Sequence, residues 1–197
     1  MDGGRLFYLR LAEELQELGL HKVHSDGALF TYVKNGQLQG LVASHVDDLF
    51  IAGNDTFDKE VTEKLKGIFK FSKIEERSFK YCGCRISSKT DGIELDQNEY
   101  VDALEKIEEM EGSNERNLKD KEKKAVRAKI GELLWISLMT RPDLSYDVNV
   151  LSGEVSNATV KTAKEINKIV TKAKGSRNVL RFAKLGDCEN LCRCQFR

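Results

Sequence analysis

The sequence predicts an α+β fold in which antiparallel hairpins covered by helices are followed by a mostly helical region. Two features predict the first part: Asn35-Gly36 lies between two apolar runs, and a second pair of apolar runs flanks Asp47-Asp48. Apolar periodicity from about residue 123 to 174 predicts the helical part. A chain of 197 residues that is 40% hydrophobic can bury the core of one ordinary domain or of two small ones.

Residues 5–18 are expected to form a helix, because apolar side chains recur at three-residue spacing and Gly19 follows as a stop signal. The expected packed face consists of Leu6, Leu9, Ala12, Leu15 and Leu18. Asn35-Gly36 predicts a type I′ turn, since both residues tolerate a positive φ. The first hairpin should therefore pair ALFTYVK with QLQGLVASHV.

A second hairpin is expected from the strands Val42–Val46 and Leu49–Ala52, with Asp47-Asp48 at the reversal. Gly53-Asn54-Asp55 then ends the strand and caps a helix that extends to residue 69. The apolar residues of this helix share one face, so the helix should lie on the sheet. They are Phe57, Val61, Leu65, Ile68 and Phe69.

The middle of the chain is expected to add one more pair of strands and a helix. A strand at about 78–87 turns through residues 89–92 into a short strand at 93–95. The helix that follows is marked by Tyr100, Val101, Leu104 and Ile107. In residues 111–124 only Leu118 is apolar, which predicts an exposed linker or long loop and a plausible domain boundary.

Beyond this segment the chain is expected to be almost entirely helical. Helices are predicted at about 123–139 and 159–174, with a break at Arg141-Pro142-Asp143 and another helix through Val148 and Leu151. Trp135 lies within an apolar helix and is expected in the core. Arg141 is expected to pair with Asp143 or to close a helix end rather than to touch nucleic acid.

Composition limits the classes of function. Lys+Arg and Asp+Glu number 32 each, so nucleic-acid binding would depend on local patches rather than on net charge. No apolar run approaches the roughly 18 to 20 residues of a membrane span, and no signal-peptide h-region is apparent. We therefore expect an intracellular protein of the cytoplasm or nucleus with no membrane partner. The five cysteines fit no established zinc pattern and are expected to be reduced thiols.

Asp47 and Asp48 are the main candidates for chemistry. One interpretation is a solvated turn or a helix cap, which is the usual place of adjacent aspartates. However, Asp-Asp suits a two-residue hairpin poorly, because that turn favours residues with positive φ. Two nearby carboxylates repel, and a divalent cation between them removes the repulsion. Hard oxygen ligands on a hairpin favour Mg2+, and the chemistry would be two-metal phosphoryl transfer.

The hairpin resembles the catalytic aspartate hairpin in the palm of a reverse transcriptase, usually written YVDD, with His45 where tyrosine is commonest. The surroundings resemble the copia-type LTR retrotransposon branch. The resemblance rests on further blocks in the family's order, namely RLFYLRLAEELQELGLHKVHSDGALF, YCGCRI, IELDQNEYVDALEKI and GELLWISLMTRPDLSYDVNVLSGEVSNAT. Thr140-Arg141-Pro142-Asp143 is the most specific tetrad, and the match runs from about residue 4 to residue 183.

The resemblance implies an RNA-directed DNA polymerase, that is, a nucleotidyltransferase of a transposable element. Asp47 and Asp48 would be catalytic residues and Mg2+ ligands in a two-metal site. The partners would be an RNA or DNA primer-template, dNTP and the remainder of a Pol polyprotein. The family's third catalytic aspartate lies upstream of its YGL motif, before the first residue of this chain. The chain is therefore expected to be catalytically incomplete and inactive alone, as a truncated or decayed element.

The resemblance also implies a division of the chain. Its expected parts are a partial palm with the VDD hairpin at 1–110, a charged linker or loop at 111–124, a helical thumb/connection at 125–183, and a divergent tail at 184–197 that is truncated before a ribonuclease H domain.

Other candidate residues have structural alternatives. Tyr81 and Gly83 fall where the family holds the primer end near the metals, or they form a bulge in an ordinary strand. Lys73 is a candidate proton donor to pyrophosphate, or a solvated surface lysine. A basic stripe on the helix at 159–174 is a candidate for phosphate binding, or a plain solvated face. It consists of Lys161, Lys164, Lys168 and Lys172.

Two other functions remain open. The chain could be a non-catalytic remnant that binds nucleic acid or a protein partner. It could also be an unrelated Mg2+-dependent phosphohydrolase with an Asp-Asp hairpin, although such enzymes generally need further carboxylates within reach.

Overall fold

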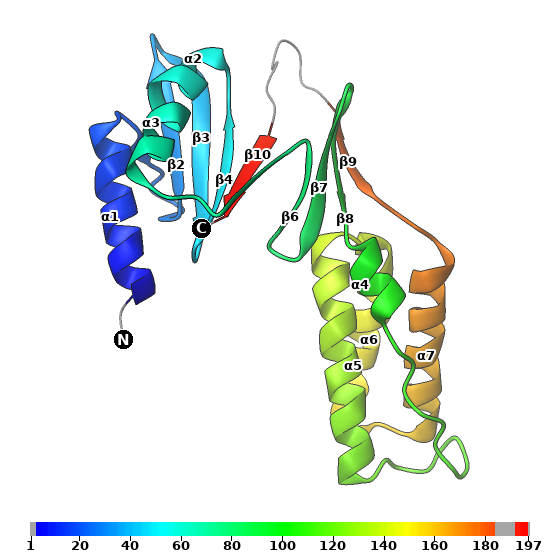
Figure 1. Cartoon of the computed structure of the whole chain (residues 1–197). Coiled ribbons are helices and arrows are strands. Elements are labelled where there is room, and N and C mark those ends of the chain that lie inside the picture. Colours follow the sequence, from blue (N-terminus) through cyan, green and yellow to red (C-terminus); the bar gives the residue numbers. More distant parts are fainter. Residues whose placement is uncertain (1–2, 184–191, 197) are drawn as a thin grey trace. The chain divides into compact units, whose positions relative to one another are not determined.

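The structure, a computed structural model, describes residues 3–183 and 192–196 and divides the chain into two compact units. The first comprises residues 1–94 and 182–197, and the second comprises residues 95–181 (Figure 1). Both contain helices, and the sheets are built from antiparallel pairs, so the chain has the predicted α+β character.

The elements of the first unit are α1 (Gly3–Glu17), β1 (His21–Lys22), β2 (Leu29–Lys34), β3 (Gln37–His45), β4 (Asp48–Gly53), α2 (Asp55–Phe57), the π-helix η1 (Asp58–Thr62), α3 (Glu63–Ile68), β5 (Lys73–Glu76), β6 (Ser78–Tyr81), β7 (Cys84–Lys89) and β10 (Cys192–Phe196). The chain leaves this unit within β8 (Gly92–Asp96) and returns to it within β9 (Leu180–Ala183).

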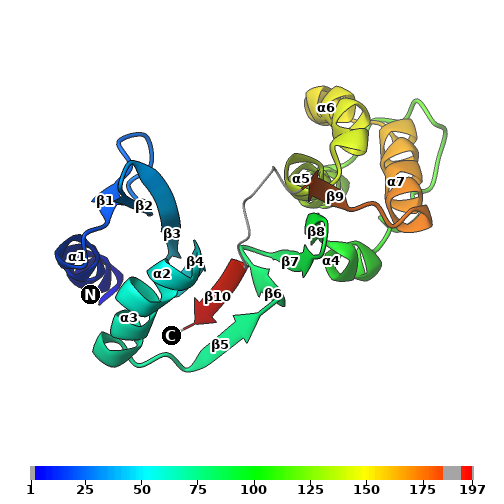
Figure 2. The same ribbon diagram turned by 90° about the horizontal axis from the view of Figure 1, so that it is seen from above.

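A six-stranded sheet in the order β1-β2-β3-β4-β10-β5 forms the centre of the first unit (Figure 2). The turn between β2 and β3 is the predicted type I′ turn, because Asn35 and Gly36 both have positive φ, +55° and +74°. The second sheet has the order β6-β7-β8-β9. Residues 78–87, predicted as one strand, instead make the β6–β7 hairpin, because Cys82 and Gly83 reverse the chain with φ of +48° and +75°.

The helices α1 and α2–η1–α3 share one hydrophobic core with the sheet. The predicted stripe at 55–69 is confirmed, and Asn54 caps the helix by accepting a hydrogen bond from the Phe57 backbone N–H at 3.0 Å. The predicted face of α1 is confirmed only in part. Leu15 is fully buried, and Ala12 and Leu18 pack against the core. Leu6 and Leu9 are 65% and 47% exposed, and the buried residues at this end of the helix are Phe7 and Leu11. Spacing of three turns the helix by about 60° at each step, so such a series cannot keep facing the sheet, whereas spacing of four stays close to one face.

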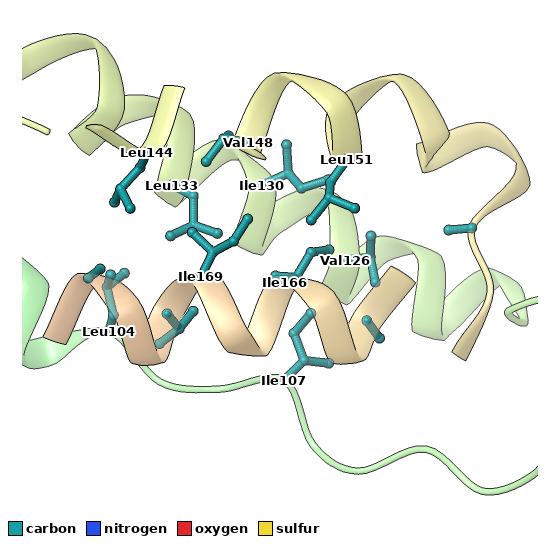
Figure 3. Packing of buried hydrophobic residues seen from close by; sticks show 14 of the residues in the cluster. Leu104, Ile107, Val126, Ile130, Leu133, Leu144, Val148, Leu151, Ile166 and Ile169 are labelled. Atoms are coloured by element: carbon teal, nitrogen blue, oxygen red, sulfur yellow. The ribbon is translucent and has the colours of Figure 1, made fainter. Parts of the chain in front are cut away.

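The elements of the second unit are α4 (Asn98–Ala103), α5 (Asp120–Met139), the 3₁₀ turn η2 (Pro142–Leu144), α6 (Ser145–Glu154), the 3₁₀ turn η3 (Val155–Asn157) and α7 (Val160–Gly175). The three longer helices close around a core that also receives Leu104 and Ile107 from the segment after α4 (Figure 3). Facing side chains from α5, α6 and α7 include Ile130, Val148 and Ile166.

Three details of the second unit differ from the sequence predictions. The helix expected through Leu104 and Ile107 ends at Ala103, although both side chains are buried. The segment expected to be a linker ends early, because α5 begins at Asp120, where Glu122 accepts a hydrogen bond from the Lys119 backbone N–H at 2.7 Å. Trp135, predicted in the core, is 40% exposed, because the buried face of α5 is formed by its neighbours in the helical repeat, such as Leu133 and Ile136.

Arg141 holds the end of the helical unit together, as its predicted structural role requires. Its side chain is 2% exposed, and its guanidinium makes two hydrogen bonds of 2.9 Å to the two carboxylate oxygens of Asp143. It also donates to the carbonyl of Ala173 at 2.9 Å and to the carbonyl and hydroxyl oxygens of Ser176, both at 3.1 Å. All five guanidinium N–H groups are therefore used, and the C-terminus of α7 is tied to the α5–α6 corner.

Within residues 3–183 and 192–196, the helices are all too short or too polar to cross a bilayer.

Candidate active site

The aspartate pair lies at the hairpin between β3 and β4, as predicted, but the two-residue turn is one residue earlier in the sequence than predicted. His45 pairs with Asp48, so the two residues of the turn are Val46 and Asp47, and Asp48 is the first residue of β4. Only Val46 in this turn has a positive φ, +56°, which fits a type II′ rather than a type I′ turn. The sequence did not reveal this, because a β-branched residue with positive φ is a backbone outlier that no propensity predicts.

Val46→Asn is expected to raise the free energy of unfolding of the first unit by about 1 kcal/mol. Asparagine tolerates the left-handed region, whereas a β-branched residue is strained there. Little packing is lost, because Val46 is 68% exposed. Denaturant titration of both variants would measure the change. Val33→Asn is the matched control, since Val33 is an exposed valine in β2, and it should be destabilising because asparagine is unfavourable in strands. Equal losses in both variants would contradict strain at Val46.

The two carboxylates differ in their surroundings. Asp47 is exposed at the tip, and Asp48 is half-buried on the strand. Burial raises the pKa of Asp48, nearby His45 lowers it, and the like charge of Asp47 raises it. Among the described residues neither carboxylate forms an ion pair or accepts a hydrogen bond. The hairpin therefore presents two adjacent acidic groups that make no ion pair or hydrogen bond in this part of the chain, with His45 as a nearby group that favours the charged form of Asp48.

The β6–β7 hairpin lies against the aspartate hairpin. The ring of Tyr81 is 6.3 Å from the imidazole of His45 and 5.6 Å from the ring of Phe50, measured between centroids. Cys82 lies close enough to Asp48 for that carboxylate to help raise the thiol pKa, after the larger effect of burial. The structure thus brings Tyr81 and Cys82 to the neighbourhood of Asp48, and Gly83 is the next residue of the same turn.

Phe50 is the residue that sequence reasoning missed in this neighbourhood. It lies two positions after Asp48 on β4 and contacts Phe79 as well as Tyr81, with ring centroids 6.0 Å apart in the Phe50–Phe79 pair. Alternate residues of a strand share a face, so Phe50 faces the same side as Asp48, while Leu49 and Ile51 enter the core. That period of two was the signal that could have found it.

The candidate lysines are not gathered at the hairpin. Lys73 is the first residue of β5 rather than a loop residue, and its ammonium lies 2.9 Å from a carboxylate oxygen of Glu75. The four lysines of the basic stripe are exposed on α7, in the second unit. Three of them have polar partners: Lys164 donates to Asn114, Lys168 pairs with Glu165, and Lys172 pairs with Asp147.

The donor set of the hairpin suits a hard divalent cation. Two carboxylates supply oxygen ligands, which Mg2+ prefers, and their charge would be offset by the cation. No group of three or more His, Cys, Asp or Glu side chains capable of holding a metal is found in residues 3–183 and 192–196. Asp47 and Asp48 thus supply two ligands, and the rest would be water, substrate phosphate or a further carboxylate.

The part of the chain that contains the aspartate hairpin matches the model of a known protein family. A family model described as reverse transcriptase (RNA-dependent DNA polymerase) matches residues 2–119. This range includes the β3–β4 and β6–β7 hairpins. Searches of curated proteins and of solved structures gave no match.

Proposed function

The chain belongs to the reverse transcriptase (RNA-dependent DNA polymerase) family, and from this premise we propose that the β3–β4 hairpin supplies Asp47 and Asp48 as the metal-binding carboxylates of nucleotidyl transfer. The observation that supports the proposal is the pair of adjacent carboxylates at the hairpin, with Asp48 half-buried and Asp47 exposed and neither in an ion pair or hydrogen bond among the described residues. A divalent cation would offset the repulsion between the two carboxylates.

In this proposal the residues around the hairpin bind and orient the reactants. Bound Mg2+ would stabilise the charge on the attacking and leaving oxygens of an in-line displacement. Asp47 and Asp48 would hold the ion and, through it, the triphosphate of the incoming nucleotide. Tyr81 and Gly83 would contact the primer end, because Gly83 has no side chain to keep a nucleic-acid backbone away.

The remaining assignments rest on the sequence resemblance. We propose that the chain is of the copia type and forms part of a Pol polyprotein. The third carboxylate of the two-metal site would be supplied by the segment that the family carries upstream of its YGL motif. Residues 1–110 would belong to the palm and 125–183 to the thumb or connection. In the latter, Lys161, Lys164, Lys168 and Lys172 would contact template or primer phosphates. Lys73 remains a candidate proton donor.

Metal binding tests the proposal without requiring turnover. Mn2+ or Mg2+ is expected to raise the midpoint of thermal unfolding of the chain, because it binds the folded hairpin and not the unfolded chain. Asp48→Asn should abolish most of this rise. It should not itself lower stability in metal-free buffer, since it removes a partly desolvated charge beside a like charge. Differential scanning calorimetry with and without Mn2+ measures both effects.

Asp91→Asn is the matched control, because Asp91 is an exposed aspartate in the turn between β7 and β8 of the same unit. It should leave the metal-dependent shift unchanged. An equal shift in the wild-type, Asp48→Asn and Asp91→Asn chains would contradict a metal site at the hairpin.

Primer extension tests the enzymatic part. A polypeptide that joins this chain to an upstream segment with the family's third aspartate should extend a DNA primer on an RNA template in Mg2+ or Mn2+. Asp47→Asn should reduce the rate by about a hundredfold to a thousandfold, because a ligand of the metal that stabilises the transition-state charge is lost. Salt-dependent RNA binding with no extension in the joined polypeptide would instead favour a non-catalytic nucleic-acid-binding remnant.

A further inference from the structure

Phe50 of β4 lies between two aromatic side chains of the β6–β7 hairpin. Its ring centroid is 6.0 Å from that of Phe79 and 5.6 Å from that of Tyr81. Tyr81 in turn contacts the imidazole of His45 edge to face, with centroids 6.3 Å apart. The rings therefore form a row that joins the β6–β7 hairpin to the aspartate hairpin, and such ring pairs stabilise a structure beyond the apolar area that they bury.

This row lies on the face of β4 that is opposite the helices. Leu49 and Ile51 are at most 1% exposed and belong to the core that the sheet shares with α1 and α2–η1–α3. Successive side chains of a strand point to opposite faces, so Phe50 points away from that core. On β6 the same period of two brings Phe79 and Tyr81 to the side that contacts Phe50.

The β6–β7 hairpin is not part of either hydrophobic core. Its residues Phe79, Cys84 and Ile86 are buried, but within the part of the chain that the structure describes they belong to neither core cluster. The position of this hairpin relative to β4 therefore depends on the contacts of Phe50 more than on the packing of the helices.

The row of rings lies next to the candidate site residues. Phe50 is two positions after Asp48 on β4, and His45 pairs with Asp48 across the aspartate hairpin. Tyr81 ends β6 and is followed directly by the turn that contains Gly83. Loss of the Phe50 ring would therefore release the β6–β7 turn from its place beside Asp48.

We propose that Phe50 is a positioning residue, whose ring sets the distance between the β6–β7 turn and the carboxylates of Asp47 and Asp48. The inference rests on the proposed function, in which Tyr81 and Gly83 contact the primer end and the carboxylates hold the metal. Phe50 acts through Tyr81 and does not itself touch metal or nucleotide. Its effect on the reaction is large, because a misplacement of roughly 1 Å between reacting groups can slow a reaction by about a hundredfold.

Hydrogen exchange on the full chain tests the structural step without metal, nucleotide or template. Phe50→Ala should speed exchange of the backbone amides in Ser78–Tyr81 and Cys84–Lys89 by about tenfold or more, because two ring contacts are lost. Phe50→Tyr should restore the wild-type rates, since a tyrosine ring can make the same contacts. The amides of α7, in the second unit, serve as the internal control.

Phe71→Ala is the matched control. Phe71 is a half-buried phenylalanine of the same unit, but it packs against the core on the helix side. Both alanine variants lose a half-buried ring, so both should lower the midpoint of thermal unfolding. Phe50→Ala alone should speed exchange of the β6–β7 hairpin relative to exchange of the β2–β3 hairpin.

Single-turnover primer extension tests the effect on the reaction, in the polypeptide that joins this chain to an upstream segment with the third aspartate. With saturating primer-template and dNTP, Phe50→Ala should lower the rate by about tenfold to a hundredfold. Phe50→Tyr should restore the rate, and Phe71→Ala should keep it below its unfolding temperature. The rise in unfolding midpoint with Mn2+ should persist in Phe50→Ala, because both carboxylates remain.

Two results would overturn the proposal. One is hairpin exchange that stays at the wild-type rate in Phe50→Ala, and the other is an unchanged extension rate in an active joined polypeptide. If Phe50→Ala does not fold, Phe50→Leu replaces it and should show the same changes in smaller measure, since leucine keeps apolar volume but no ring. A wild-type joined polypeptide that extends no primer would count against the polymerase proposal instead, and exchange in the full chain would still show whether Phe50 holds the hairpin.

Discussion

Arg141→Ala is expected to lower the free energy of unfolding of the helical unit by about 2–4 kcal/mol, because the buried guanidinium is lost and buried acceptors left without a donor cost about 1–3 kcal/mol each. All five N–H groups of Arg141 donate hydrogen bonds inside the unit. Alanine would leave the Ala173 and Ser176 carbonyls without this donor and the Asp143 carboxylate without its cation. Because typical domains are stable by only about 5–15 kcal/mol, the loss should be visible as partial unfolding at moderate temperature.

Hydrogen exchange of α7 amides and denaturant titration would measure this loss. Arg141→Lys should recover little of it, because an ammonium group cannot make the two parallel bonds to Asp143. Arg177→Ala is the matched control. Arg177 is an exposed arginine of the same unit that lies 3.0 Å from Asp102, and exposed pairs contribute at most about 1 kcal/mol. Similar losses in Arg141→Ala and Arg177→Ala would contradict the role of Arg141 as a buried clamp.

The same pair predicts a pH dependence. Hydrogen bonds from Arg141 hold the pKa of Asp143 below its ordinary value. A carboxyl whose pKa is lower in the folded state stabilises the fold at pH values above its unfolded pKa, and this contribution is lost as the pH falls through the folded pKa. Acid titration should therefore destabilise the helical unit more in the wild-type chain than in Asp143→Asn.

Gly53→Ala is expected to destabilise the first unit by about 1–3 kcal/mol or more, as overpacking of a filled core does. A Cβ at Gly53 would lie well inside van der Waals contact with the ring of Phe57, and the same holds at Gly40 on the neighbouring strand. Phe57 is fully buried, so its ring has no free space in which to move. The strands β3 and β4 carry these glycines, and a shift of either strand would also displace the Val46–Asp47 turn and the neighbouring Asp48.

Thermal unfolding of the Gly53→Ala and Gly67→Ala variants would test this account. Gly67 is a glycine of α3 whose added Cβ meets nothing within 4 Å, so alanine there should stabilise by about 0.5–1 kcal/mol through helix propensity. The double variant Gly53→Ala with Phe57→Leu should lose less than the sum of its single variants, because the smaller side chain makes room for the methyl group. Additive losses would show that the ring is not the obstacle.

The particular successes and failures of the sequence predictions have a common physical basis. Asn35-Gly36 predicted its turn correctly, because the φ requirement of a type I′ turn acts within two residues. The N-terminal part of the buried face of α1 was mispredicted, because more than one side of that helix is apolar and only the neighbouring sheet selects which side is buried. Trp135 was mispredicted for the same reason, since helices α6 and α7 determine which face of α5 is buried.

For the candidate site, the sequence located Asp47 and Asp48 and predicted that they lie at a hairpin. Only the fold shows that Val46 occupies the turn, that Phe50 and Tyr81 lie beside the carboxylates, and that β10 completes the sheet next to β4. The roles of Asp47, Asp48, Lys73, Tyr81, Gly83 and the basic stripe stay predictions until they are measured.

By itself, the sequence determined the α+β class, the position of the first turn, the helical second half and the reverse transcriptase family. The first three follow from patterns within short stretches of chain, where periodicity and turn chemistry act directly. The family follows from the resemblance of several sequence blocks to reverse transcriptases. Only the tertiary structure decided which helix faces are buried, that Arg141 joins α7 to the α5–α6 corner, and which strands flank the aspartate hairpin. Those outcomes depend on contacts between residues far apart in sequence, such as Arg141 with Ser176, and no local pattern contains them.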